Sequence, residues 1–273
     1  MVFLYPLVFA LALPQPIQAR AKESNLKLTN NRLTYGEFGA TRTDSRYLPG
    51  DAFCFAFEIE GIKSDESGKV SFTMGMELTD SKGKEVFKQA PVDREEYLTL
   101  GGNRLPARAF VRLGMTQLPG TYTCKITIFD RATGDRKSIE QKFEVLSKNL
   151  GIINVLYSSD QEGAVSLAPV GVAGQTYWLQ CSVVGFERNP LKKLPDLDIE
   201  MTAFEKGKQL LQKPIMIGIN DKVGPTDEIL PVQFLVPLSR PGDFTIELKV
   251  TDKVSKKVNK VTLPLKVLSA TDR

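Results

Sequence analysis

The sequence of 273 residues contains no histidine, only three cysteines and a single tryptophan. Without histidine, a Ser-His-Asp triad and a Cys-His pair are excluded, together with the commonest zinc ligand. No nucleophile motif and no glycine-rich phosphate loop is present either. The sequence therefore predicts a protein that is not an enzyme. A small hydrolase with two paired carboxylates is the remaining catalytic alternative, and no segment fixes such a pair across a cleft.

Neither sign of charge predominates in the sequence. It has 36 lysines and arginines and 32 aspartates and glutamates, for a net charge of +4. So small an excess does not predict binding of nucleic acid. No apolar run beyond residue 13 is long enough to span a bilayer, which takes about 20 residues. We therefore expect neither a nucleic-acid partner nor an integral membrane protein.

The N-terminus holds one short apolar run, residues 2–13, followed by prolines and small residues. Ala19 and Ala21 stand in the A-x-A arrangement of a cleavage site, so residues 1–21 are predicted to be a signal peptide. The run is interrupted by Pro6 and is short for a membrane anchor. We expect cleavage after Ala19 or Ala21 and a secreted, periplasmic or cell-surface protein.

The rest of the chain contains an internal repeat. Residues 119–146 align without a gap with residues 241–268, so that "LPGTYTCKITIFD" recurs as "RPGDFTIELKVTD". Upstream, residues 50–61 match residues 174–185 in the same order. The sequence therefore indicates a tandem duplication, and each copy is long enough to bury a core of its own. The two predicted domains span residues 25–148 and 150–269.

Within each copy, apolar residues recur at every second position. Tyr122, Cys124, Ile126 and Ile128 alternate with polar residues, and residues 244–250 repeat the pattern. Such alternation is typical of strands with one buried face, and turn signals such as "SKGK" and "ATGD" separate the strands. No segment shows a sustained helical period. The sequence predicts an all-β protein built from two antiparallel β-sandwiches.

The stretch "GTYTC" resembles the G-x-Y-x-C signature of the sixth strand in immunoglobulin-like domains, with Gly120, Tyr122 and Cys124 in the matching places. With its repeat, the chain is similar to the tandem immunoglobulin-like β-sandwich repeats of exported bacterial proteins. The resemblance implies that Tyr122 makes a corner contact two residues before the cysteine. It also implies that Cys54 is the disulfide partner of Cys124.

Strand phase leaves this pairing open. Cys124 shares the inward phase of its strand, whereas Cys54 stands between Phe53 and Phe55, which form the apolar set of theirs. A step of one residue turns a side chain to the other face, so a Cys54–Cys124 bond requires a bulge. A buried free thiol at Cys124 is the alternative. A free and exposed Cys54 would be a candidate for intermolecular bonding.

The only metal candidates are weak ones. The stretch "DLDIE" places Asp196, Asp198 and Glu200 on one face of a predicted strand, and Ca²⁺ prefers such hard oxygen ligands. A solvated acidic face is the alternative interpretation. Apart from this calcium candidate, no cofactor is expected.

One long predicted loop covers residues 90–107 and contains Gly101 and Gly102. Sandwich domains commonly bind partners through such loops, and an empty crossover is the alternative. The candidate binding residues in this loop are Asp93, Arg94, Tyr97, Asn103 and Arg104.

These observations predict an exported, non-catalytic binding or scaffolding protein that contacts an envelope or extracellular protein. The alternative is a carbohydrate-binding or calcium-stiffened structural module. A glycan platform needs exposed aromatic rings, and the sequence offers only Trp178 and Tyr97 for that purpose.

Overall fold

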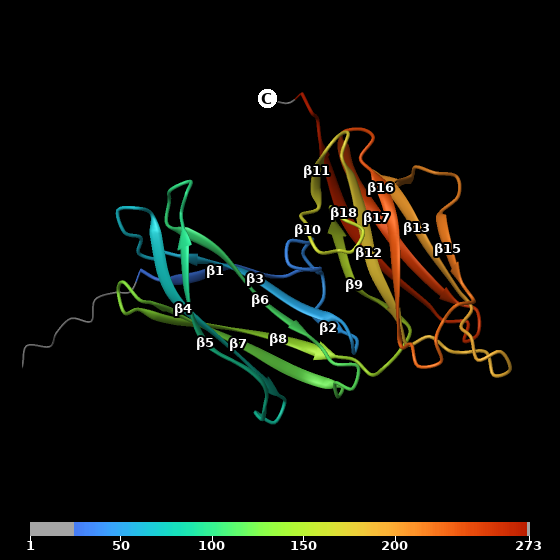
Figure 1. Ribbon diagram of the computed structural model, residues 1–273, viewed down its shortest axis with the longest axis horizontal. Coiled ribbons are helices and arrows are strands. Elements are labelled where there is room, and N and C mark those ends of the chain that lie inside the picture. The colour runs from blue at the N-terminus through green and yellow to red at the C-terminus, as the bar shows by residue number, and fades with distance from the viewer. Residues whose placement is uncertain (1–24, 272–273) are drawn as a thin grey trace, which may run out of the picture.

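The computed structural model describes residues 25–271, and every regular element in that part of the chain is a β-strand. The strands form two β-sandwiches, which confirms the predicted all-β class (Figure 1). Residues 25–271 include no helix long and apolar enough to cross a membrane. The predicted signal peptide, residues 1–21, lies outside the described residues.

The first sandwich packs a three-stranded sheet against a five-stranded sheet. The smaller sheet has the order β1-β3-β6 and contains β1 (Lys27–Leu33), β3 (Ala52–Glu60) and β6 (Arg104–Arg112). The larger sheet has the order β2-β8-β7-β4-β5 and contains β2 (Arg46–Tyr47), β8 (Arg136–Val145), β7 (Gly120–Asp130), β4 (Lys69–Asp80) and β5 (Glu85–Tyr97). Neighbouring strands are antiparallel except β2 and β8, which run parallel.

The second sandwich has the same two-layer design. Its smaller sheet, β10-β9-β12-β16, contains β10 (Ser166–Leu167), β9 (Gly151–Ser158), β12 (Thr176–Val184) and β16 (Ile229–Pro237). Its larger sheet, β11-β18-β17-β13-β14, contains β11 (Val170–Val172), β18 (Val258–Leu268), β17 (Gly242–Asp252), β13 (Leu197–Glu205) and β14 (Lys208–Gln209). β15 (Ile215–Ile219) also pairs with β13 at this edge, and β11 runs parallel to β18.

Each sandwich buries a separate apolar core between its sheets. Cys124, Ile126 and Ile128 of β7 are fully buried there, as their alternation predicts, and they pack in one cluster with Phe53 and Phe55 of β3. Each such side chain contributes about 1.5–3 kcal/mol through burial. The second core draws on β9, β12, β13, β16, β17 and β18 in the same way.

The corner contact implied by the family resemblance is present. The hydroxyl group of Tyr122 donates a hydrogen bond of 2.7 Å to the carbonyl oxygen of Leu118, four residues earlier. The ring of Tyr122 is buried and stacks on Phe143 with centroids 5.6 Å apart. This contact fixes the turn that leads into β7. Phe244 occupies the aligned position in β17 and has no hydroxyl group to make the bond.

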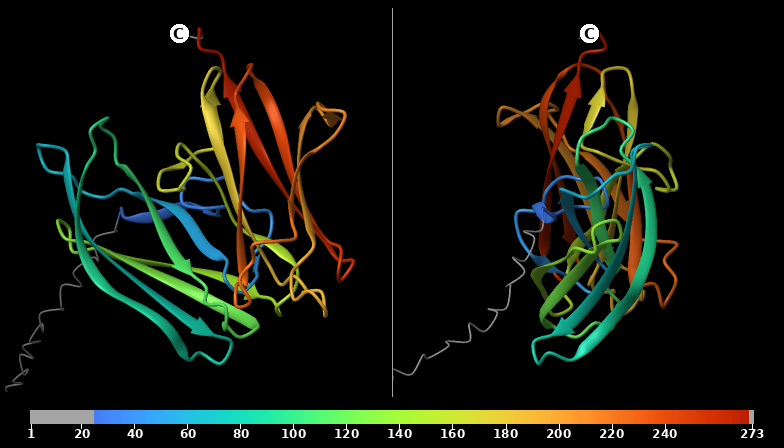
Figure 2. Two further views of the ribbon diagram at one scale, coloured as in Figure 1. Left: turned by 45° about the vertical axis from the view of Figure 1, so that its right-hand side comes forward. Right: turned by 90° about the vertical axis from the view of Figure 1, so that its left-hand side faces the viewer.

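The two sandwiches lie at a steep angle to each other and enclose an open wedge (Figures 1 and 2). Only five residues separate the end of β8 at Val145 from the start of β9 at Gly151. The hairpin formed by residues 33–42 leaves the first sandwich and reaches the second. Its Ala40 is 5% exposed and belongs to the second core, which makes this hairpin part of both sandwiches.

Candidate binding cleft between the sandwiches

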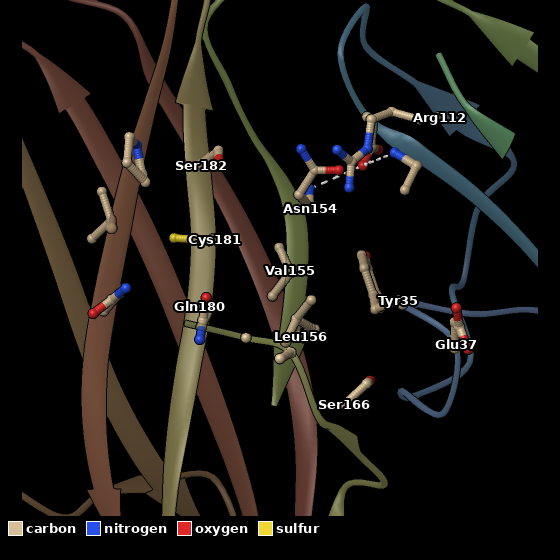
Figure 3. A pocket seen from close by; sticks show the side chains of 18 of the residues that line it. Tyr35, Glu37, Arg112, Asn154, Val155, Leu156, Ser166, Gln180, Cys181 and Ser182 are labelled. Atoms are coloured by element: carbon tan, nitrogen blue, oxygen red, sulfur yellow. Dashed lines mark hydrogen bonds between the residues drawn. The ribbon is translucent and has the colours of Figure 1, made fainter. Parts of the chain in front are cut away.

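A hollow of about 640 Å³ lies at the base of the wedge. One wall consists of the 33–42 hairpin and the outer face of β6. The opposite wall is the outer face of β9, β12 and β16. Figure 3 shows Val155 and Leu156 of β9 on one side, with Tyr35 and Glu37 of the hairpin facing them. The cleft therefore exists only because two sheets from different sandwiches face each other.

Two backbone hydrogen bonds close the hairpin. The amide N–H of Tyr35 bonds the carbonyl oxygen of Ala40 at 2.9 Å, and that of Arg42 bonds Leu33 at 2.8 Å. Gly36 at its tip has φ of +68°, a left-handed conformation that favours glycine. A Cβ atom there would lie 3.2 Å from the Cβ atom of Leu156 in β9. The tip therefore rests directly on the second sandwich.

A buried ion pair links the hairpin to the junction between the sandwiches. Nη1 of Arg42 lies 3.0 Å from Oδ2 of Asp51, and the two side chains are only 9% and 5% exposed. Oδ1 of Asp51 accepts the backbone N–H of Asn154 at 3.0 Å, across the junction. The side-chain amide of Asn154 donates to the carbonyl oxygen of Gly50 at 3.1 Å. Asp51 therefore bonds the hairpin with one oxygen and the second sandwich with the other.

Two aromatic rings hold the arginine of this ion pair. The guanidinium carbon of Arg42 lies 4.7 Å from the ring centroid of Tyr35 and 4.1 Å from that of Tyr47. Burial is the largest single influence and lowers the pKa of Arg42, but the charge and hydrogen bond of Asp51, together with Tyr47 and Tyr35, raise that pKa above its ordinary value. The arginine is therefore charged at every physiological pH.

Close backbone approach completes the junction. A Cβ atom on Gly151 would lie 2.1 Å from Cδ1 of Leu48, and one on Gly50 would lie 3.3 Å from Cδ1 of Ile153. Both glycines bring the first sandwich against β9 and leave no room for a side chain. Lys148 and Glu228 form a further ion pair on the surface beside the junction. Together these contacts fix the angle at which the walls of the cleft meet.

The open part of the cleft offers apolar rings next to charged groups. Phe38 and Phe110 are 47% and 40% exposed, and both line the cleft. The guanidinium of Arg108 lies 4.1 Å from the ring centroid of Phe38 and forms an ion pair of 2.9 Å with Glu37. Arg112 also lines this wall and has no ion-pair partner among residues 25–271.

The facing wall is rich in amide groups. Nε2 of Gln180 donates to Oγ of Ser158 at 2.9 Å, and Nε2 of Gln233 donates to the carbonyl oxygen of Gln161 at 2.8 Å. These bonds hold both amides in place over β12 and β16. Glu162 adds an exposed carboxylate that has no ion-pair partner in the described chain. Such a surface, with fixed amides opposite aromatic rings and arginine, can bind an extended polar segment.

The thiols do not provide a nucleophile. All three cysteines are buried, and burial raises the pKa of Cys54, Cys124 and Cys181 to about 12. They are therefore protonated near neutral pH, and a protonated thiol is a poor nucleophile. In the cleft, the carboxylates of Asp51 and Glu37 are each bonded to an arginine. The lining shows no arrangement of nucleophile and base.

The disulfide that the resemblance implies does not form. Cys54 and Cys124 are both free, and no disulfide joins any residues that the structure describes. Cys124 belongs to the first core, whereas Cys54 lies on the opposite face of β3 from Phe53 and Phe55, as the strand phase indicates. The outward phase of Cys54 does not make it accessible, because Cys54 is only 2% exposed. The hairpin covers it, and Cys54 lies beside Gly36.

The acidic residues in and just before β13 form ion pairs with lysines. Nζ of Lys253 lies 2.7 Å from Asp198 and 3.4 Å from Asp196, while Nζ of Lys249 lies 2.9 Å from Glu200. Residues 25–271 contain no cluster of three or more histidine, cysteine or acidic side chains that could hold a metal ion. The acidic groups on β13 thus form ion pairs with the basic strand and turn beside them.

The segment 90–107, which was predicted to be a loop, is mostly β-strand. Asp93, Arg94 and Tyr97 belong to β5, Arg104 begins β6, and only Asn103 lies in the connection between the two strands. Asp93 bonds Thr73 and Arg131, and Arg104 bonds Glu58 and Glu60. β5 is exposed on both faces, so it lacks the alternation that reveals a strand. None of the five candidates lines the cleft.

The cleft residues were missed because they are scattered along the sequence. They come from the hairpin, β6, β9, β12 and β16, and most occupy the outward positions of strands, which alternation marks only as exposed. One signal was available in the sequence: Phe110 is an aromatic residue in an outward position, between the inward residues Ala109 and Val111. The facing of two sheets from different sandwiches has no local signature.

The chain shows only low similarity to known proteins. No family model matches the chain, and no curated protein matches it. Among solved structures, the C-terminal domain of the AgI/II polypeptide BspA of Streptococcus agalactiae is 10% identical, with 88% of this chain and 100% of that chain covered and a TM-score of 0.30. The C-terminal domain of the antigen I/II-family protein AspA of Streptococcus pyogenes is 9% identical, with 89% and 99% covered and a TM-score of 0.30.

A family 123 glycoside hydrolase from Clostridium perfringens is 10% identical, with 46% of this chain and 28% of that chain covered and a TM-score of 0.32. Similarity at these scores carries no functional argument.

Proposed function

We propose that this chain is an exported, non-catalytic binding protein that takes an extended segment of an envelope or extracellular protein into the cleft between its two sandwiches. The observation that carries the proposal is the exposure of Phe38 and Phe110 beside Arg108 and Arg112 in a cleft of about 640 Å³. Aromatic and arginine side chains are the residue types enriched at protein interfaces. A hollow of this size admits several residues of an extended chain.

The fixed junction supports a binding role. Asp51 bonds Arg42 on one side and Asn154 on the other, so the walls of the cleft are held before a partner arrives. A partner that enters such a preformed site loses less of its binding free energy to ordering the protein. The fixed amides of Gln180 and Gln233 leave carbonyl oxygens that can accept hydrogen bonds from the partner's backbone.

A non-catalytic role fits the groups that line the cleft. The sequence has no histidine, the thiols are protonated, and the cleft carboxylates of Asp51 and Glu37 are bonded to arginines. A general acid or base needs a free titratable group within reach of its substrate. Glu162 is the one cleft carboxylate without an ion pair in the described chain, and a single carboxylate does not make a hydrolase.

We further propose that both sandwiches are immunoglobulin-like and arose by duplication. The corner contact of Tyr122 supports the first statement. In support of the second, a short strand runs parallel to the last strand in each sandwich, β2 beside β8 and β11 beside β18. Export follows from the predicted signal peptide at residues 1–21.

The test uses two matched phenylalanines. Phe110 and Phe129 are 40% and 39% exposed on strands of the first sandwich, but only Phe110 lines the cleft. The mature chain, residues 22–273, is immobilised and exposed to envelope and secreted fractions of the producing cell. We expect a retained protein whose binding falls at least tenfold with Phe110→Asp and is unchanged with Phe129→Asp. Crosslinks from the cleft wall to that protein should map the segment it inserts.

Two results would contradict the proposal. Retention that both variants weaken equally would place the contact outside the cleft. Binding of a soluble glycan, with no protein retained, would instead favour the carbohydrate-binding alternative. Trp178 and Tyr97 do not line the cleft and stand on different sandwiches, so they do not form one glycan platform.

A further inference from the structure

The second sandwich is open along one side, and that side is apolar. A groove of about 420 Å³ runs between β16, the edge of one sheet, and the edge of the other sheet, where Leu210 and Leu211 follow β14 and Ile215 begins β15. Apolar side chains on and beside this groove are at least 40% exposed, namely Leu210, Leu211, Ile215, Met216 and Leu235. Exposed apolar residues gathered in this way mark an interaction surface.

The strand beside this groove has a free edge. β13 pairs with β17 on one side and with β14 and β15 on the other, and no further strand within residues 25–271 pairs with β15. The sequence of β15, IMIGI, contains no charge and no proline. An edge strand of this kind leaves backbone N–H and C=O groups available to another strand.

The corresponding edge of the first sandwich is protected against pairing with another strand. Its edge strand, β5, carries four consecutive charged residues at positions 93–96. Its pairing with β4 is interrupted between Met74 and Met76, where Pro91 packs against Gly75. Charge, proline and a bulge are the devices by which proteins prevent pairing at an edge. β15 lacks all three.

We propose that β15 pairs antiparallel with β15 of a second copy, about a two-fold axis through Ile217. This register places Ile215 opposite Ile219 of the partner, so that apolar residues face each other along the shared edge. Just beyond the strand it places Lys213 opposite Asp221, and the symmetry makes that pair twice. Both side chains are exposed, and neither has an ion pair in the described chain.

Charge complementarity selects this register among its neighbours. With the axis at residue 216, Lys213 faces Ile219, and with the axis at residue 218 it faces Val223. Only the axis at Ile217 pairs lysine with aspartate at both ends. Opposite charges directly across an antiparallel pair are stabilising, and like charges are destabilising. The pairing is isologous, as a two-fold dimer requires.

The test is sedimentation equilibrium of the mature chain, residues 22–273, over a range of concentrations. We expect a monomer–dimer equilibrium. Lys213→Asp and Asp221→Lys each place like charges across both ends, and each should weaken the dimer about tenfold. The double variant Lys213→Asp/Asp221→Lys restores opposite charges and should restore the dimer. Because both single variants change exposed residues, this rescue separates a lost contact from misfolding.

A charge within each edge strand provides the control. Met216→Lys in β15 should weaken the dimer, whereas Val92→Lys in β5, also at an exposed position, should leave it unchanged. A protein that stays monomeric at every concentration overturns the proposal. A dimer that neither single charge reversal weakens, or that Val92→Lys disrupts instead, overturns it as well.

Discussion

Asp130 and Asp252 end β7 and β17 as completely buried residues, and each accepts a backbone hydrogen bond from the connection that follows a strand of the opposite sheet of its own sandwich. Oδ2 of Asp130 accepts the backbone N–H of Lys63 after β3, and Oδ2 of Asp252 accepts that of Glu187 after β12. Each aspartate also accepts an N–H two residues further along its own hairpin. The aspartate that closes both copies of the repeated phrase therefore joins the two sheets of each sandwich.

Removal of this aspartate should destabilise the second sandwich. Asp252→Ala leaves the N–H groups of Glu187 and Val254 and the hydroxyl of Ser255 without their acceptor. We expect a loss of about 3 kcal/mol in the free energy of unfolding, measured by urea denaturation. Asp243→Ala, at an exposed position in the same strand, should change it by less than about 0.5 kcal/mol. Equal effects of the two variants would contradict the assigned role.

Loss of Asp51 should loosen the junction. Asp51→Ala leaves the guanidinium of Arg42 buried between two tyrosine rings without its counter-ion, which costs about 3–5 kcal/mol. We expect a lower melting temperature and a wider distribution of angles between the sandwiches in X-ray scattering. Arg104→Ala breaks a pair with Glu60 in which the arginine is exposed, and should cost less than about 1 kcal/mol. An unchanged scattering profile for Asp51→Ala would contradict its role in fixing the angle between the sandwiches.

The thiols should be unreactive in the folded protein. With their pKa raised to about 12, about one in ten thousand of them is ionised at pH 8, so a thiol reagent should react only after unfolding. All three should then react, without prior reduction. Rapid reaction of Cys54 in the native protein would show that the 33–42 hairpin opens.

The same thiols predict a pH dependence of stability. Their pKa is higher in the folded chain than the ordinary value of 9.0, so the folded state retains protons that the unfolded state loses. Their contribution is complete below pH 9 and is lost as the pH rises toward about 12. Replacement of Cys124 by alanine should flatten this alkaline decline, as measured by urea unfolding at several pH values.

Calcium should not stabilise the protein through β13. Asp198 and Glu200 already have lysine partners at 2.7 and 2.9 Å, and a cation would have to displace them. We expect the same melting temperature with calcium and with a chelator. The control is Lys253→Ala, which removes the lysine partner of Asp196 and Asp198. If calcium binds at this strand at all, this variant should show the larger rise in melting temperature. A calcium-induced rise in the wild-type melting temperature would revive the metal site.

The sequence alone determined the architecture of this protein. Alternation of apolar and polar residues depends only on which face of a strand meets the core, and it identified the buried positions of β4, β7 and β17. It also placed Cys54 and Cys124 on faces of different character, which is why they do not bond. β5 escaped detection because a strand that is exposed on both faces has no reason to alternate.

Tertiary structure decided everything that depends on segments meeting across a distance. Cys54 points away from its own core, yet it is buried because the hairpin of residues 33–42 folds over it. The acidic groups of β13 meet lysines only through the pairing of β13 with β17 and the turn after it. The cleft exists because Asp51 and two glycines set the angle between the sandwiches. Local pattern reports burial against a strand's own core, and it contains no information about a surface that a second domain covers.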